Sequence, residues 1–281
     1  MSLPLQSSHW FSDGIRRIWL PIGADSIEPQ LQRLLVEKGF VRSPQPLHLL
    51  HQVLPPNDTR LDENYLNAVT RAFYVQDPPL LSAYYEFLRA LRREVIREDF
   101  VFQRSPIVRF HFPSPFPGKL RTSNGLGLQQ HSDTLGGHPF ELLQGWVPLC
   151  DCDGSAALHI SSRDDGIAIL SHFLRNIGGD EARYRHGLDA FYRERDRDLE
   201  LQRRIVDGCP PCPMQRGEVL LFDPRCVHGG VENRSPYTRV SVDFRLMPCS
   251  VYEALLAQPN AGELGRFRRG EIFHSATIDT L

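Results

Sequence analysis

The stretch 238–246 constrains the fold more than any other part of the chain. From Arg239 to Leu246 polar and apolar side chains alternate strictly, and the polar set is Arg239, Ser241, Asp243 and Arg245. Successive side chains of a strand point to opposite faces, so this pattern predicts a strand with one polar and one apolar face. The polar face either meets water or lines the inside of a barrel that holds a polar ligand.

Shorter runs of the same kind predict more strands before and around it. They lie near 99–102, 108–112, 142–149, 156–160, 217–222 and 227–232. The sequence Asp151-Cys-Asp-Gly154 is a strong turn signal between two of them. We therefore predict a mainly β fold with flanking helices, of the double-stranded β-helix type, also called a cupin-like jelly roll.

Helical spacing of apolar residues occupies the rest of the chain. It is found at 25–39, 61–75 and 79–97, and again in a charged insertion at 164–206. We expect a single domain over 1–281, with a helical N-terminal layer (1–98), a jelly-roll core (99–248) and a C-terminal tail (249–281). As a hypothesis, the insertion closes over a bound substrate.

Composition excludes some partners. The chain has 281 residues, and its 32 Lys and Arg against 34 Asp and Glu give a net charge of −2. No strong field for nucleic acid or a membrane surface follows from this balance. There is no signal peptide pattern and no apolar run of about 18 residues. We expect a cytoplasmic protein with a small-molecule substrate, and the sequence leaves its oligomeric state open.

Four of the six cysteines raise the question of a second metal. Cys150 and Cys152 form a C-x-C pair, and Cys209 and Cys212 form a C-x-x-C pair. Together they could offer four thiolates to zinc. The first pair has the wrong spacing and follows an apolar run, so reduced thiols are the favoured interpretation.

Two distant motifs indicate an iron site. His131 and Asp133 form a His-x-Asp motif, and His228 follows 97 residues after His131. Two imidazoles and one carboxylate are the facial ligand set of non-haem Fe(II) oxygenases. His138 is a competing ligand, although its place before Pro139 favours a pocket-lining role.

The polar face of 238–246 offers a partner for a carboxylate. Arg239 supplies a permanent charge with two parallel donors, and the Ser241 hydroxyl lies on the same face. We expect this pair to bind the carboxylate of a co-substrate. Asp243 and Arg245 are interpreted as a structural pair, and it stays open whether Arg109 and His111 also point inward.

At these residues the chain resembles the Fe(II)/2-oxoglutarate-dependent dioxygenases of the phytanoyl-CoA dioxygenase-like branch. The streptomycin-biosynthesis oxygenase-like group is the nearest match within it. The resemblance covers about 130–248, and its further motifs are Gly137-His-Pro139, Trp146-Val-Pro-Leu149, Gly217-Glu-Val-Leu-Leu-Phe222 and His228-Gly229. The insertion at 164–206 is longer and more helical than is usual for that group.

The resemblance implies an enzyme. Fe(II) would be held by His131, Asp133 and His228, and 2-oxoglutarate by Arg239 with Ser241. With O2, the co-substrate would be converted to succinate and CO2 while a small polar metabolite is hydroxylated or otherwise oxidised, as in secondary-metabolite biosynthesis. Halogenating relatives replace the carboxylate ligand, so Asp133 favours hydroxylation. The alternatives are a non-catalytic or zinc-filled jelly-roll binding protein, and a protein-side-chain hydroxylase of the same fold.

Overall fold

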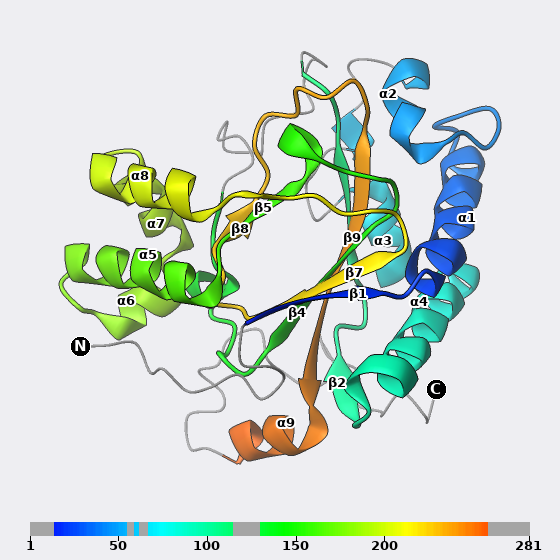
Figure 1. Ribbon diagram of the computed structural model, residues 1–281. Coiled ribbons are helices and arrows are strands. Elements are labelled where there is room, and N and C mark those ends of the chain that lie inside the picture. Colours follow the sequence, from blue (N-terminus) through cyan, green and yellow to red (C-terminus); the bar gives the residue numbers. More distant parts are fainter. Residues whose placement is uncertain (1–13, 55–58, 62–66, 115–129, 258–281) are drawn as a thin grey trace.

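The computed structural model describes residues 14–54, 59–61, 67–114 and 130–257. A six-stranded antiparallel sheet organises it, in the order β1-β7-β4-β9-β2, with β3 also paired to β9 (Figure 1). Its strands are β1 (Ile15–Trp19), β2 (Phe100–Phe102), β3 (Ile107–His111), β4 (Leu143–Pro148), β7 (Glu218–Phe222) and β9 (Arg239–Pro248).

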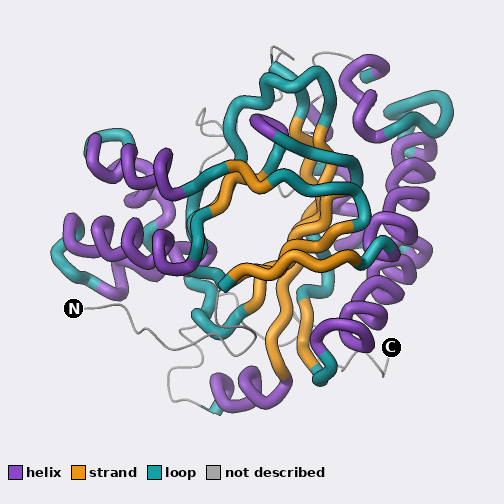
Figure 2. Tube along the Cα trace, viewed as in Figure 1, coloured by secondary structure: helices purple, strands orange, loops and turns teal. Residues whose placement is uncertain are grey.

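A smaller sheet faces the large one across the interior (Figure 2). Its order is β6-β5-β8, from β5 (Leu158–Ile160), β6 (Pro211–Cys212) and β8 (His228–Gly229). An apolar cluster that includes Trp146, Leu158 and Phe222 fills part of the space between the sheets. The prediction of a mainly β, jelly-roll fold with flanking helices is confirmed.

Helices cover the outer face of the large sheet. The main ones are α1 (Ile22–Glu37) and α4 (Pro78–Leu91), accompanied by α2 (Leu50–Val53) and α3 (Ala68–Tyr74). They form one core with the apolar face of β9, including Val240, Val242 and Phe244. A Cβ at Gly145 would lie 2.1 Å from the Phe244 ring, so β4 needs glycine there to let the ring pack across it. The apolar residues of β9 therefore face outward, and its polar residues face the interior.

The insertion forms a second helical unit beside the barrel. It contains α5 (Arg163–Asn176), α6 (Glu181–Arg185), α7 (Leu188–Arg195) and α8 (Leu199–Gly208). Their apolar faces make a separate core, which also takes in Leu135 and Val227. These two residues neighbour the predicted metal ligands, so the insertion is anchored on the loops that carry them. No helix in the described ranges is long and apolar enough to span a membrane.

Several predicted boundaries were wrong. The N-terminal layer is not wholly helical, because β1 pairs with β7 at the edge of the large sheet. The predicted strand 227–232 shortens to β8, since the following chain is held by side chains such as Asn233, which donates to the His111 carbonyl (3.0 Å). The predicted helix 79–97 becomes α4 followed by a π turn at Arg92–Ile96.

The C-terminal tail begins with α9 (Cys249–Leu256), and residues 258–281 lie outside the described part. The predicted helix 61–75 is described only as a 3-10 turn at Thr59–Leu61 and as α3, because 62–66 also lie outside it. Further 3-10 turns are Leu47–Leu49, Asp133–Gly136 and Gly154–Ala156. The single-domain division itself stays a prediction.

Candidate metal centre

Backbone pairing brings the two distant histidines together. The amide of His131 donates to the carbonyl of His228, and the amide of His228 donates to the carbonyl of His131, both at 2.8 Å. This reciprocal pair is an antiparallel bridge, and it places the imidazole rings 4.9 Å apart. The His-x-Asp motif is therefore joined to the smaller sheet at β8.

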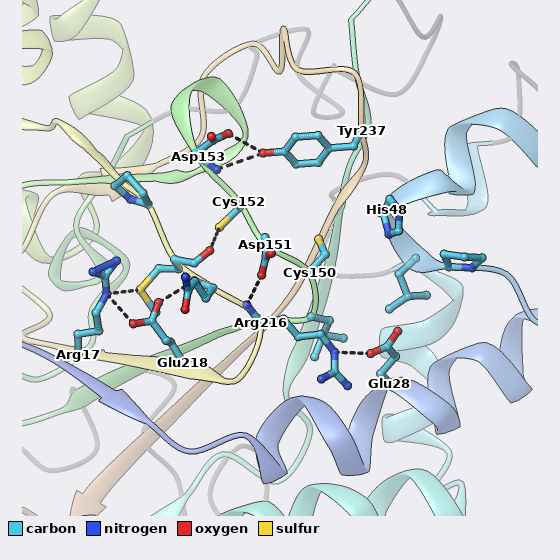
Figure 3. Close-up of a pocket in the computed structure, with 16 residues that line it drawn as sticks. Arg17, Glu28, His48, Cys150, Asp151, Cys152, Asp153, Arg216, Glu218 and Tyr237 are labelled. Carbon is cyan, nitrogen blue, oxygen red and sulfur yellow. Dashed lines mark hydrogen bonds and ion pairs between the residues drawn. The ribbon is translucent and has the colours of Figure 1, made fainter.

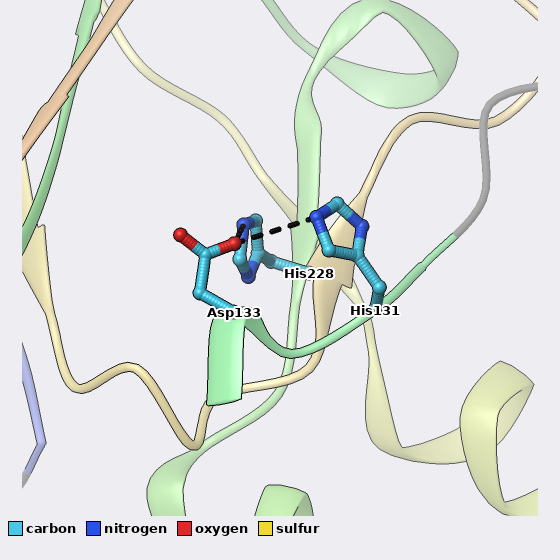
Figure 4. A group of neighbouring side chains, drawn as sticks. All are labelled: His131, Asp133 and His228. Atoms are coloured by element: carbon cyan, nitrogen blue, oxygen red, sulfur yellow. Dashed lines mark ion pairs between the residues drawn. The ribbon is translucent and has the colours of Figure 1, made fainter. Parts of the chain in front are cut away.

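Asp133 completes a cluster of three possible ligands (Figure 4). Its Oδ1 lies 3.5 Å from His131 Nε2 and 4.0 Å from His228 Nε2. One ligand atom from each residue lies within 4.8 Å of the others, and no other such group was found among the described residues. Two imidazole nitrogens and one carboxylate oxygen fit Fe(II), with room for further ligands.

The ring of His228 is fixed by its neighbours. Its Nδ1 lies 3.0 Å from the carbonyl of Cys226, so Nδ1 carries the proton and Nε2 presents its lone pair toward Asp133. The Phe222 ring packs edge-on against it at 4.8 Å between centroids. Burial and the neighbouring His131 lower the pKa of His228 to about 4, so its imidazole is neutral at pH 7, as metal binding requires.

Arg245 and Gln144 fix the carboxylate of Asp133. Arg245 donates through Nε at 2.8 Å and through a second guanidinium nitrogen at 2.5 Å, both to Oδ2, which also accepts from the Gln144 amide. Burial opposes ionisation of Asp133, but Arg245 and the nearby histidines hold its pKa well below the usual range. Oδ1 is thereby left directed toward the histidines.

The expected pairing of Asp243 with Arg245 was wrong. Arg245 binds Asp133 from β9, and Asp243 instead binds Arg109 from β3 through a short ion pair. The sequence carried a usable signal, because Arg245 lies on the same strand face as Arg239. The sequence gave no sign that Asp133 is the partner of Arg245, because the two residues are 112 positions apart.

The predicted carboxylate-binding pair also faces the interior. Arg239 is 2% exposed, donates to the Ala156 carbonyl at 3.4 Å and lies 5.8 Å from the Trp146 ring. The Ser241 hydroxyl is buried and has no hydrogen-bond partner among the described residues. An unpartnered buried hydroxyl is costly unless a ligand accepts or donates to it. The polar face of β9 therefore has the character of a ligand-binding wall rather than of an exposed surface.

Two other predicted residues lie inside as well. Arg109 pairs with Ser241 in the register of β3 and β9, and His111 pairs with Arg239. His111 is fully buried, and this burial together with Arg239 holds its pKa well below the usual value. His138 is partly buried and close enough to Asp133 to influence its charge, but it is outside the cluster of three.

The cysteines do not assemble a second metal site. Cys209 belongs to the core of the insertion, whereas Cys152 and Cys212 belong to the core between the sheets. All six are free, and the grouping of possible metal ligands found in the described part of the chain does not include them. Burial raises the pKa of Cys150 to about 11 and that of Cys152 to about 12, so both remain protonated thiols.

A large pocket lies at the other end of the sheet from the three ligands (Figure 3). It measures about 990 Å³, and none of the cluster residues lines it. Its cations are paired, since Arg216 binds Glu28 at 2.7 Å and Arg17 lies 3.4 Å from Glu218. Sequence reasoning did not predict this pocket. The size of this pocket does not identify it as the reaction site, because the three possible metal ligands converge elsewhere.

Comparison with known proteins agrees with this geometry. Residues 177–241 match the family model described as phytanoyl-CoA dioxygenase, and this segment contains His228 and Arg239. Over this segment the chain is similar to that family, which confirms the resemblance stated from the sequence. The match supports a phytanoyl-CoA dioxygenase-like 2-oxoglutarate oxygenase. A comparison with curated proteins gives no match.

Solved structures that are similar to this chain are distant in sequence. The apo form of EctD from S. alaskensis has 14% identity and a TM-score of 0.46, over 88% of this chain and 82% of that one. AviO1 from Streptomyces viridochromogenes Tue57 has 13% identity and a TM-score of 0.42, over 85% and 91%. The non-haem alpha-ketoglutarate-dependent epimerase SnoN from nogalamycin biosynthesis has 13% identity and a TM-score of 0.38, over 84% and 78%.

Proposed function

We propose that the protein uses His131, Asp133 and His228 to bind Fe(II) and oxidises a small polar metabolite with 2-oxoglutarate and O2. The convergence of the three ligand atoms carries this proposal. O2 would be the oxidant and bound Fe(II) would activate it, while 2-oxoglutarate supplies two electrons and leaves as succinate and CO2. The narrower likeness to streptomycin-biosynthesis oxygenases and the cytoplasmic location stay predictions.

The residues of the chain have distinct tasks in this proposal. The two histidines and Asp133 hold the metal, and Arg245 with Gln144 keeps the carboxylate turned toward it. Arg239 and the Ser241 hydroxyl bind the distal carboxylate of 2-oxoglutarate inside the barrel. The apolar cluster around Trp146 and Phe222 keeps water away from the reacting centre.

An anaerobic titration tests the cofactor assignment. Adding 2-oxoglutarate to the Fe(II) protein should produce a weak visible charge-transfer band, because chelation of the 2-oxo acid requires open positions on a facial triad. Exposure to air should then release succinate. A zinc-filled binding protein would give neither the band nor succinate, and either absence would refute the proposal.

Loss of Arg245 should weaken metal binding without removing a ligand. Arg245→Gln deletes both donors to Asp133 Oδ2, and outer-sphere partners of this kind typically contribute about 10- to 100-fold in metal affinity. Anaerobic calorimetry with Fe(II) measures the change. Arg203→Gln, which removes an exposed arginine of α8, is the matched control and should keep wild-type affinity. Equal affinities for both variants would exclude the positioning role of Arg245.

The insertion should respond to occupancy of the metal site. Tyr184 of α6 lies 2.7 Å from the Thr134 hydroxyl, which lies 2.6 Å from that of Ser132, between the two ligands of the His-x-Asp motif. Fe(II) and 2-oxoglutarate should therefore slow proteolytic cleavage in the exposed α5–α6 connection. Tyr184→Phe should reduce this protection. Protection that is the same in the variant would indicate that the insertion is an independent unit.

A further inference from the structure

A partly buried ion pair near the three possible metal ligands has no role in the proposed function described above. It joins Arg109 of β3 to Asp243 of β9 through the Arg109 Nε and the Asp243 Oδ2. Both side chains belong to the inward faces of their strands, next to Ser241. They are 28% and 18% exposed, so the pair borders open space rather than lying sealed in the core.

The second oxygen of Asp243 is the informative atom. Asp243 Oδ1 is buried and has no hydrogen-bond partner among the described residues. A carboxylate oxygen in this situation accepts a hydrogen bond when a ligand supplies the donor, since leaving it without one costs free energy. Asp243 also contributes electrostatically to the pKa of His228, which places it near the cluster.

Tyr192 of the insertion approaches the same place from the other side. It is partly buried, and α7 packs beside the Asp133–Gly136 turn. Burial raises the pKa of Tyr192 to about 12, and the charges of Asp133 and Arg109 also act on it. The phenol is therefore a neutral side chain near enough to both groups to feel their charges, and its ring offers an apolar surface.

The charge at this location restricts the ligand. Among the described inward-facing residues of this region, Arg109, Arg239 and Arg245 carry three positive charges, against two on Asp133 and Asp243. A divalent metal and a dianionic co-substrate would cancel one another and leave this excess. A cationic substrate is therefore disfavoured by this positive excess. Asp243 Oδ1 nevertheless needs a hydrogen-bond donor. A hydroxyl group meets both conditions, because it is neutral and both donates and accepts.

We propose that Arg109 and Asp243 form the substrate subsite of this enzyme and that the subsite takes a neutral, hydroxyl-rich compound. One hydroxyl donates to Asp243 Oδ1, a neighbouring oxygen accepts from the Arg109 guanidinium, and the carbon face of the molecule packs against Tyr192. This inference rests on the proposed function, since it names the substrate class of the same site.

Three probes of matched shape test the charge rule. D-Glucose, D-glucosamine and D-glucuronate are pyranoses that are respectively neutral, cationic and anionic. Each is added to the Fe(II) protein with 2-oxoglutarate under nitrogen, where no turnover occurs. Broadening of the probe's proton resonances by the paramagnetic iron reports binding close to the metal. The wild-type protein should broaden glucose most.

Variants of Asp243 and Arg109 should change the preference among the three probes in opposite directions. Asp243→Asn leaves the Arg109 charge uncompensated, so glucuronate should gain over glucose by about tenfold. Arg109→Gln leaves the Asp243 charge uncompensated, so glucosamine should gain by a similar factor. Arg234→Gln, an exposed arginine paired with Glu232, should keep the wild-type order. If Asp243→Asn fails to fold, Arg109→Gln still tests the pair from its other side.

Two results would overturn the subsite. One is an unchanged order of the three probes in the variants, and the other is no broadening of glucose by the wild-type protein. The charge-transfer band of the anaerobic titration shows whether a failure concerns the substrate subsite or the cofactor assignment. A band without probe selectivity refutes only the subsite, whereas no band refutes the oxygenase proposal itself.

Discussion

Replacing Arg239 with alanine should raise the apparent KM for 2-oxoglutarate by two to three orders of magnitude. The guanidinium is buried on the inner face of β9, where a carboxylate is costly unless it is paired. Removing one partner of a buried ion pair typically costs about 3–5 kcal/mol, which corresponds to that change in KM. Iron affinity should remain nearly normal, because Arg239 is not in the ligand cluster. Steady-state kinetics with varied 2-oxoglutarate gives the apparent KM, and anaerobic calorimetry gives the Fe(II) affinity.

Graded variants sharpen the test of Arg239. Arg239→Lys should be intermediate, because lysine keeps the charge but loses the two parallel donors. Ser241→Ala should be milder, since one neutral donor to a charged acceptor is worth about 1.5–3 kcal/mol. A near-normal KM for Arg239→Ala, together with a large increase for Arg109→Gln, would move the carboxylate anchor to β3.

Replacing His131, Asp133 or His228 with alanine should abolish turnover and strongly lower iron affinity. Each residue supplies one of three protein ligands, and the remaining two cannot hold the facial geometry. Succinate formation and Fe(II) binding are the two measurements, and His138→Ala is the matched control. Wild-type turnover in any triad variant would remove that residue from the ligand set, and loss of iron in His138→Ala would add His138 to it.

The barrel and its ligand cluster were largely predictable because both depend on local patterns. The alternation of 238–246 predicted β9 and its two faces, and the His-x-Asp motif predicted the nucleus of the cluster. The sequence did not predict β1, where Arg16 and Arg17 interrupt the alternation. That strand forms because β7, about two hundred residues later, provides its hydrogen-bond partners.

Side-chain partners across the interior were beyond sequence reasoning for the same reason. Arg245 binds Asp133 and Asp243 binds Arg109, although the two residues of β9 are neighbours on one face. Which partner each takes depends on how the strands register against one another, and Gln144 lies opposite Arg245 only in that register. The large pocket near Arg216 likewise forms from segments that are distant in the sequence.

The reciprocal hydrogen bonds between His131 and His228 make the ligand set preorganised. The bridge fixes their main-chain positions at β8, so a bound metal would spend little binding energy on ordering the polypeptide. A chelator should consequently strip the ion without melting the barrel, and reloading should be rapid. During synthesis, the cluster cannot assemble before the strand with His228 has left the ribosome and docked. Because β9 follows His228 in the sequence, the wall that carries Arg239 and Arg245 is completed last.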